Sequence, residues 1–168
     1  ILLEKDHELS KSLYYKYSSN NLVKIINTDV LKYNFENIKG KSFILIGNLP
    51  YNISSQILVR IIKIKGLEKK FSNLILMFQK ELGEKIMGKF PSKNYGRLSI
   101  ISNYKLNFIK NFLVSSNCFF PKPKVTSMVI HFGILKKNKI KINKISNLEK
   151  ITNIFFSNKR KMINKSIK

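Results

Sequence analysis

The sequence predicts an α/β fold built on a doubly wound sheet, and three observations favour it. Short apolar runs of strand length alternate with segments of helical periodicity along the first half of the chain. Several of these runs end in an acidic or amide side chain. In the second half, apolar runs follow one another with less helical sequence between them. This alternation indicates parallel strand–helix–strand units, and the later runs fit an antiparallel pair at one edge.

The expected elements follow one another in chain order. Strands are expected at short runs rich in Ile, Leu, Val and Phe, which are residues 1–6, 23–26, 43–46, 74–78, 98–104 and 125–132. Helices are expected where apolar residues recur every three or four positions, at residues 7–17, at residues 53–65 and again beyond residue 148. The lysine-rich residues 136–144 are typical of a linker. We therefore expect an α/β domain over residues 1–135, and a linker with the beginning of a small helical domain over residues 136–168.

The chain carries a strong positive charge. Lys and Arg number 32, whereas Asp and Glu number 9, which gives a formal net charge of +23. A polyanion is the natural partner, because each phosphate that is contacted releases counterions. Nearly all of the basic residues are Lys, and Ile and Asn are also abundant. The codon bias of an AT-rich genome therefore accounts for part of the charge, and a solvated basic surface is the alternative interpretation.

The composition also excludes several classes of protein. Hydrophobic residues make up 43% of the chain, so it can bury a core and is not a disordered tail. Cys118 is the only cysteine, which excludes a disulfide framework and a thiolate metal site. No apolar run reaches the length of a membrane span, and no signal peptide precedes the first expected strand. We expect a cytoplasmic protein that does not bind a membrane.

The sequence Asn48-Leu49-Pro50-Tyr51, between an expected strand and an expected helix, suits an exocyclic base amine. The Asn48 side-chain oxygen and a backbone carbonyl next to Pro50 can accept the two N–H groups of such an amine. Pro50 restricts φ and so holds that carbonyl in place. The Tyr51 ring offers a face to a flipped-out base. With both protons held, the lone pair of the amine can turn towards a methyl donor.

Acidic side chains end two of the expected strands. Glu4 closes the first strand, Asp29 follows the second, and Asn48 closes the third. In open α/β sheets, ligands bind at the carboxyl ends of the strands. One carboxylate there can hold ribose hydroxyls, and a second can accept the hydrogen bond of an adenine amino group. We expect an adenosine-bearing cofactor at Glu4 and Asp29.

Ordinary local structure offers an alternative at each of these positions. Residues 48–51 could be a proline-containing turn with Asn52 or Ser54 as the helix cap. Glu4 and Asp29 could be helix caps or turn residues, and Asp29 could simply begin a turn.

Four segments of the chain, taken in order, match the motifs of one family. They are residues 48–55, residues 77–86 with 95–99, residues 119–127 and residues 156–162. Together they resemble the ribosomal RNA adenine N6-dimethyltransferases over nearly the whole chain. The resemblance implies a Rossmann-like class I methyltransferase sheet that uses S-adenosyl-L-methionine and needs no metal. Residues 1–135 would be the catalytic domain, and residues 136–168 a linker and the beginning of a helical RNA-binding domain.

The resemblance also implies a reaction and a partner. The reaction would be N6-dimethylation of two adjacent adenines near the 3′ end of small-subunit (16S) rRNA, in ribosome biogenesis. The partner would be this rRNA or the pre-30S particle, and we expect a monomer. Glu4 would bind the ribose of S-adenosyl-L-methionine, and Asp29 its adenine.

In the family, the target adenine is held by residues that match four positions of this chain. Asn48 would contact both the methyl donor and the target amine, and the Pro50 region would supply the second acceptor. Tyr51 would stack on the target adenine, with Phe119 on its other side. Phe120 is adjacent to Phe119 and could substitute for it.

Basic residues suggest where RNA phosphate is contacted. Arg97 could contact a phosphate, and a structural Arg in a tight turn is the alternative. A basic helical cluster is expected to form an RNA phosphate surface, with a solvated face as the alternative. Its members are Lys159, Arg160, Lys161, Lys165 and Lys168, and the first three are the expected RNA-binding residues.

The chain departs from the family pattern at both ends. The family's first strand and its Gly-rich cofactor loop have no counterpart before Ile1, and the family's helical domain runs on past Lys168. We expect the chain to be part of an enzyme that alone binds the cofactor weakly or not at all and can be inactive. Three alternatives remain open: a large-subunit rRNA adenine methyltransferase of the antibiotic-resistance type, a DNA adenine methyltransferase, and a non-catalytic RNA-binding assembly factor. The later motifs favour the small-subunit enzyme over the first two, and the intact motif at residues 48–51 argues against the third.

Overall fold

The computed structural model describes residues 1–136, 142 and 144–157. The chain divides into two compact units, an N-terminal unit of residues 1–39 and a C-terminal unit of residues 40–168, and each is described by itself. The boundary that the sequence predicts after residue 135 is a different one, and it stays a prediction. The basic cluster Lys159, Arg160 and Lys161 lies outside the described residues.

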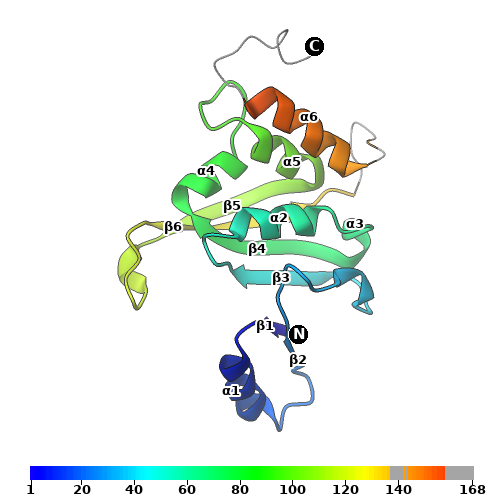
Figure 1. The fold of residues 1–168 in the computed structure, drawn as a ribbon, viewed down its shortest axis with the longest axis vertical. Helices are drawn as coiled ribbons and strands as arrows, with labels where there is room; N and C mark the ends of the chain where they lie inside the picture. The colour runs from blue at the N-terminus through cyan, green and yellow to red at the C-terminus, as the bar shows by residue number, and fades with distance from the viewer. Residues whose placement is uncertain (137–141, 143, 158–168) are drawn as a thin grey trace. The chain divides into compact units, whose positions relative to one another are not determined.

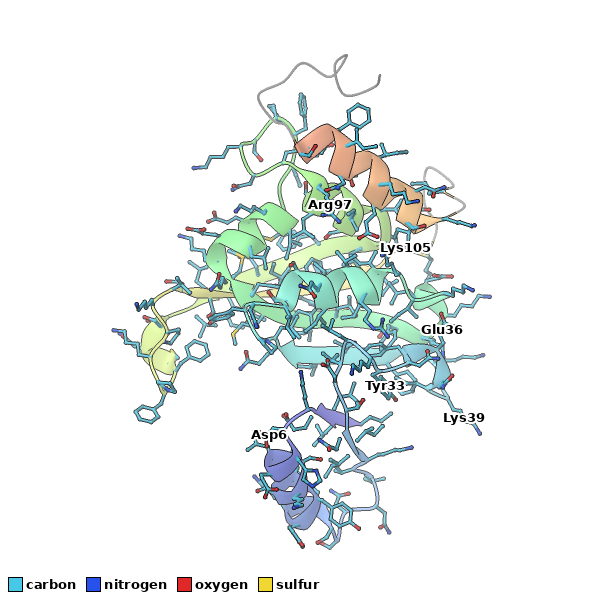
Figure 2. All side chains as sticks on the ribbon, in the orientation of Figure 1. Asp6, Tyr33, Glu36, Lys39, Arg97 and Lys105 are labelled. Atoms are coloured by element: carbon cyan, nitrogen blue, oxygen red, sulfur yellow. The ribbon has the colours of Figure 1, made fainter. Side chains whose placement is uncertain are left out.

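The N-terminal unit is a single strand–helix–strand unit. Strands β1 (Leu2–Glu4) and β2 (Ile25–Asn27) pair in parallel, and helix α1 (His7–Tyr17) connects them. The helix begins at Asp6, whose carboxylate accepts the N–H of Leu9 at 2.8 Å (Figure 2). The predicted helix at residues 7–17 and the predicted parallel pairing are both confirmed. A short 3₁₀ turn, Phe35–Asn37, follows β2.

The C-terminal unit contains a four-stranded mixed sheet (Figure 1). Its strands are β3 (Phe43–Asn48), β4 (Phe71–Gln79), β5 (Leu106–Val114) and β6 (Ser127–Ile134). The order is β3-β4-β6-β5, with β3 and β4 parallel and the other two pairs antiparallel. The expected antiparallel pair at one edge is therefore present.

Five helices and the sheet form the hydrophobic core of this unit, within the described residues. The helices are α2 (Ser54–Ile62), α3 (Leu67–Lys70), α4 (Lys80–Ile86), α5 (Arg97–Lys105) and α6 (Ile145–Ser157). Leu74, Leu76 and Phe78 alternate along β4 and are fully buried, so one face of the strand points into the core. Helix α4 lies so close to β6 that a Cβ on Gly83 would come within 2.8 Å of the Met128 sulfur. Helix α5 packs against α2, α4 and α6.

One expected strand is wrong. Residues 98–104 are helical and form most of α5, and the strand begins only at Leu106. The Ser99 hydroxyl accepts the N–H of Gly96 at 3.0 Å and donates to its carbonyl at 2.8 Å, which starts a helix at that point. The buried residues Ser99, Ile101 and Ser102 then follow a helical spacing. A short apolar run is compatible with the periodicity of a helix and with that of a strand. Here the capping by Ser99 favours the helix.

Candidate active site

The carboxyl ends of β1 and β2 bring Glu4 and Asp29 to the same edge of the N-terminal unit. Glu4 is the register partner of Asn27, and its carbonyl accepts the N–H of Thr28 at 2.8 Å. Asp29 follows two residues after β2. The Asn27 amide donates to the carbonyls of Glu4 at 2.9 Å and of Lys5 at 3.1 Å, so it ties the turn after β1 to the neighbouring strand. These bonds hold the backbone of Glu4 against the segment that leads to Asp29.

Each carboxylate already has a protein partner. A Glu4 oxygen accepts the N–H of Asp6 at 2.8 Å. One Asp29 oxygen accepts the N–H of Leu31 at 2.9 Å, and the other lies 3.0 Å from the Lys5 ammonium. The Leu31 N–H, and after it Lys5, lower the pKa of Asp29 below its ordinary value. Asp29 is therefore an anion at neutral pH.

The alternatives for these two acids have different outcomes. Glu4 is not the cap of the helix, because Asp6 occupies that position. Asp29 does begin a turn, since its carbonyl accepts the N–H of Lys32 at 2.8 Å. A carboxylate oxygen has more than one lone pair, so both acids keep acceptor capacity for a ligand with hydroxyl or amino donors. The two acceptor groups at this edge fit the hydroxyl and amino donors of an adenosine-bearing cofactor.

In the C-terminal unit, the Asn-Leu-Pro-Tyr turn (residues 48–51) begins where β3 ends. Asn48 is the register partner of Met77 on β4, and its side chain is exposed. Leu49 is buried and anchors the turn in the core. The Pro50 carbonyl accepts the N–H of Ile53 at 3.2 Å. Among the described residues no donor reaches the Leu49 carbonyl, which leaves it available as an acceptor.

The alternative of a side-chain cap on α2 is not what the structure shows. The residue before the helix is Ile53, and no side chain caps the first turn. The hydroxyl of Ser54, which is fully buried, instead donates to the Tyr51 carbonyl at 3.1 Å. Asn52 is exposed. The turn is thus held from the core side by Leu49 and Ser54, while Asn48 is exposed.

Tyr51 connects this turn to a distant part of the chain. Its hydroxyl lies 2.6 Å from the hydroxyl of Ser127, the buried first residue of β6. The preceding residue, Thr126, accepts the N–H of Lys80 through its carbonyl at 2.9 Å. The Tyr51 ring is half-buried. Its orientation is therefore coupled to the segment that carries Phe119.

That segment, the β5–β6 connection (residues 115–126), projects from the end of the sheet where β3 also ends (Figure 1). It contains the 3₁₀ turn Ser116–Cys118. Phe119 follows this turn and is half-buried, whereas Phe120 is exposed over its whole surface. The structure thus brings Tyr51 and the segment of Phe119 to one end of the sheet, and it distinguishes the two neighbouring phenylalanines.

Arg97 has a structural partner. Its guanidinium lies 3.2 Å from the Glu149 carboxylate, which links α5 to α6 (Figure 2). Lys63, the residue that follows α2, pairs with the same carboxylate. Arg97 thus has a structural contact, although it lies at the start of α5 and not in the tight turn of the alternative, and a phosphate contact by its remaining N–H groups stays a prediction.

Two residues at these sites had no predicted role. Ser127 forms a hydrogen bond with Tyr51. The sequence feature that could have identified Ser127 is its position just after the proline-rich segment, at the start of a strand. Asn27 joins the two strand ends of the N-terminal unit. The sequence feature that could have identified it is an amide side chain at the end of an expected strand. Within the described ranges, no group of three His, Cys, Asp or Glu side chains could hold a metal ion. No helix in that part of the chain is long and apolar enough to cross a membrane.

Solved structures show the same fold. A dimethyladenosine transferase from Plasmodium falciparum superposes with a TM-score of 0.79 at 24% identity, covering 98% of this chain and 57% of that chain. The 23S rRNA methyltransferase ErmE superposes with a TM-score of 0.72 at 22% identity, covering 98% of this chain and 64% of that chain. The expected Rossmann-like methyltransferase fold is confirmed.

Relatives found by sequence share a higher identity with this chain than the two solved structures do. The ribosomal RNA small subunit methyltransferase A of Pelagibacter ubique is 43% identical over 164 residues, which are 98% of this chain and 62% of the relative. The protein of the same name from Malacoplasma penetrans is 37% identical over 168 residues, with 99% of this chain and 58% of the relative covered. The chain therefore spans about three fifths of the length of these relatives. A family model described as ribosomal RNA adenine dimethylase matches residues 1–168, and the chain belongs to that family.

Proposed function

We propose that the protein transfers methyl groups from S-adenosyl-L-methionine to the N6 atoms of two adjacent adenines near the 3′ end of small-subunit rRNA, during ribosome biogenesis. The observation that carries the proposal is the Asn-Leu-Pro-Tyr turn at the end of β3, in a chain that matches the family over all of its residues. The names of the relatives support the small subunit as the substrate. A large-subunit target is supported only by a likeness of fold.

The turn orients the target amine by accepting its two protons. The Asn48 side-chain oxygen takes one N–H, and a carbonyl next to Pro50 takes the other. The Leu49 carbonyl suits the second role, because the Pro50 carbonyl already accepts the Ile53 N–H. An amine held in this way directs its lone pair away from the turn. It needs no strong general base, since its proton can leave after the new bond has formed.

Aromatic side chains hold the base itself. Tyr51 stacks on one face of the flipped-out adenine, and Phe119 packs on the other. The hydrogen bond between Tyr51 and Ser127 fixes the tyrosine before the base arrives. A ring that is already fixed loses little freedom on binding, so more of the stacking energy remains for affinity.

The polar part of the cofactor is assigned to the strand ends. Glu4 accepts hydrogen bonds from the ribose, Asp29 accepts from the adenine amino group, and Asn48 contacts the donor end. When bound, S-adenosyl-L-methionine supplies a methyl group on a sulfonium, whose leaving group is already activated. Phosphates of the rRNA, bound as free RNA or in the pre-30S particle, pair with Arg97 and with the cluster Lys159, Arg160 and Lys161. The enzyme acts as a cytoplasmic monomer without a metal.

Methyl transfer to purified ribosomal subunits tests this proposal. The full-length protein is incubated with labelled S-adenosyl-L-methionine and small subunits that lack the modification, and the labelled nucleosides are mapped by primer extension and mass spectrometry. We expect dimethyladenosine at two adjacent 3′-end positions. Label in large subunits or in DNA would favour the rival enzymes, and RNA binding without label would favour the assembly factor.

A pair of asparagine variants tests the role of the turn. We expect Asn48→Ala to lower the rate of methyl transfer about 100-fold or more, because one of two preorganised acceptors is lost. Asn52→Ala is the matched control, since Asn52 is an exposed asparagine directly after the turn with no proposed contact. Equal rates for the two variants would contradict the proposal.

A further inference from the structure

The β5–β6 connection displays an aromatic ring that the proposed chemistry does not use. The relative exposure of Phe120 is 102%, the largest of any large hydrophobic side chain in the described part of the chain. Its neighbour Phe119 is half-buried. A single exposed apolar side chain is ordinary, so the surroundings of this ring decide whether it has a role.

The connection that carries the ring is held at both ends. At its start, the Ser115 hydroxyl accepts the N–H of Asn117 at 3.2 Å, and the Ser116 carbonyl accepts the N–H of Phe119 at 3.3 Å. At its end, the Thr126 carbonyl accepts the N–H of Lys80. The next residue, Ser127, is the partner of Tyr51. Phe120 is therefore displayed on a fixed support that is bonded to the proposed base-binding tyrosine.

The charge around Phe120 is entirely positive along the sequence. Lys122 and Lys124 follow it, alternate with prolines and are both exposed. No acidic residue occurs between Glu84 and Glu149. Exposed lysines beside an exposed aromatic ring are typical of surfaces for single-stranded nucleic acid, where bases stack on the ring and phosphates pair with the cations. Lysine is depleted in protein–protein interfaces, which disfavours a protein partner.

We infer that Phe120, Lys122 and Lys124 form a contact for the unpaired RNA strand next to the target adenine. Phe120 stacks on a base that flanks the target, and the two lysines pair with phosphates of the same strand. This inference rests on the proposed function and extends it, because it assigns Phe120 to a neighbouring nucleotide and leaves the target base to Tyr51 and Phe119. Phe120 is thus a positioning residue for the substrate.

Binding of short RNAs tests the stacking. The full-length protein is titrated, without a methyl donor, against a fluorescently labelled hairpin with unpaired adenines and against a fully paired duplex of the same length. We expect Phe120→Ala to weaken binding of the hairpin about fivefold to tenfold and to leave binding of the duplex unchanged. Phe120→Tyr should keep the affinity of the wild-type protein. The thermal unfolding midpoint should not change in either variant, because the ring makes no buried contact.

Phe90 provides a matched control. It is a second exposed phenylalanine in the same unit, with a relative exposure of 80%, and it also lies between lysines and precedes a proline. Phe90→Ala should leave the affinity for the hairpin unchanged. Equal losses for Phe90→Ala and Phe120→Ala, or no loss for Phe120→Ala, would overturn the inference.

Salt dependence tests the lysines separately. Replacing both Lys122 and Lys124 by Ala should reduce the slope of log affinity against log salt by about 1.4, since each contact with a single strand contributes about 0.7. Replacing Lys89 and Lys93, which flank Phe90, should leave the slope as it is. Equal slopes for the two double variants would contradict the phosphate contacts.

The two proposals can fail separately. A protein that binds the hairpin through Phe120 but transfers no methyl group would overturn the proposed function and leave the RNA contact standing. Adenine methylation at the expected positions, with no effect of Phe120→Ala on binding, would support the proposed function and overturn the RNA contact.

Discussion

In the N-terminal unit a carboxylate, Glu4, ends β1 and a second one, Asp29, follows β2 by two residues, whereas in the C-terminal unit β3 ends in the amide of Asn48, followed by a proline turn. Glu4 and Asp29 accept backbone N–H groups, and Asp29 also pairs with Lys5. Asn48 has no charge, and the tyrosine of its turn is held by the hydroxyl of Ser127. Charged acceptors suit the hydroxyl and amino groups of a cofactor. Neutral acceptors suit an amine that must keep its lone pair free for reaction.

The two units also differ in how they are packed. Phe35 is the only buried large hydrophobic residue within residues 1–39, and side chains such as Leu22 are almost fully exposed there. The C-terminal unit buries full layers from α2, β4 and β6. Hydrophobic burial is the main source of stability, so the turn at Asn48 rests on the firmer support. The geometry that the proposed methyl transfer requires is thus built on the better-packed unit.

The largest predicted effect tests this difference in packing. Phe78 is fully buried on β4, and we expect Phe78→Ala to lower the free energy of unfolding by about 3–5 kcal/mol, because it leaves a cavity. Leu22→Ala in the N-terminal unit should change it by less than about 0.5 kcal/mol, since Leu22 is 92% exposed. Urea denaturation followed by circular dichroism measures both. Comparable losses would contradict the difference between the units.

Local signals explain which parts of the fold can be predicted from the sequence. Helix α1 is predicted at its observed bounds from the helical spacing of apolar residues such as Leu9 and Leu13, whereas its cap, Asp6, is expected within the first strand. The turn at Asn48 is predicted because a proline follows a short apolar run. The pairing of Tyr51 with Ser127 joins residues 76 positions apart, and no local pattern records such a contact. The apolar residues of α5 predict a strand, because the polar capping interaction of Ser99 that starts the helix is not part of the apolar pattern.

Glu4→Gln replaces the charged acceptor at the end of β1 by a neutral one. We expect Glu4→Gln to raise the KM for S-adenosyl-L-methionine about tenfold and to leave kcat nearly unchanged, because hydrogen bonds to a charged acceptor are stronger than those to a neutral one. Glu8→Gln is the control, since Glu8 is an exposed acid of α1 that pairs with Lys11. A fall in kcat with an unchanged KM would place Glu4 at the reacting atoms and remove the contrast with Asn48.

The hydrogen bond between Tyr51 and Ser127 is expected to have a smaller effect. Tyr51→Phe leaves the buried Ser127 hydroxyl without its partner and should cost about 1 kcal/mol of stability. Adding Ser127→Ala removes the unsatisfied group, so the double variant should lose little more than Tyr51→Phe alone. Denaturation of the three variants gives the coupling energy. Strictly additive losses would mean that the two hydroxyls do not interact.

The smallest expected effect concerns the pH dependence of the N-terminal unit. The pKa of Asp29 is lowered in the folded chain by the Leu31 N–H and by Lys5, whereas the unfolded chain has the ordinary value of about 3.9. The stabilisation is therefore fully present above that value and is lost as the pH falls through the lower, folded pKa. Lys5→Met should move the pKa of Asp29 back towards its ordinary value in an NMR titration of the carboxyl carbon, and Lys11→Met should not. If Lys5→Met left the pKa unchanged, the backbone N–H alone would hold the charge, and the ion pair would add nothing to the difference between the two strand ends.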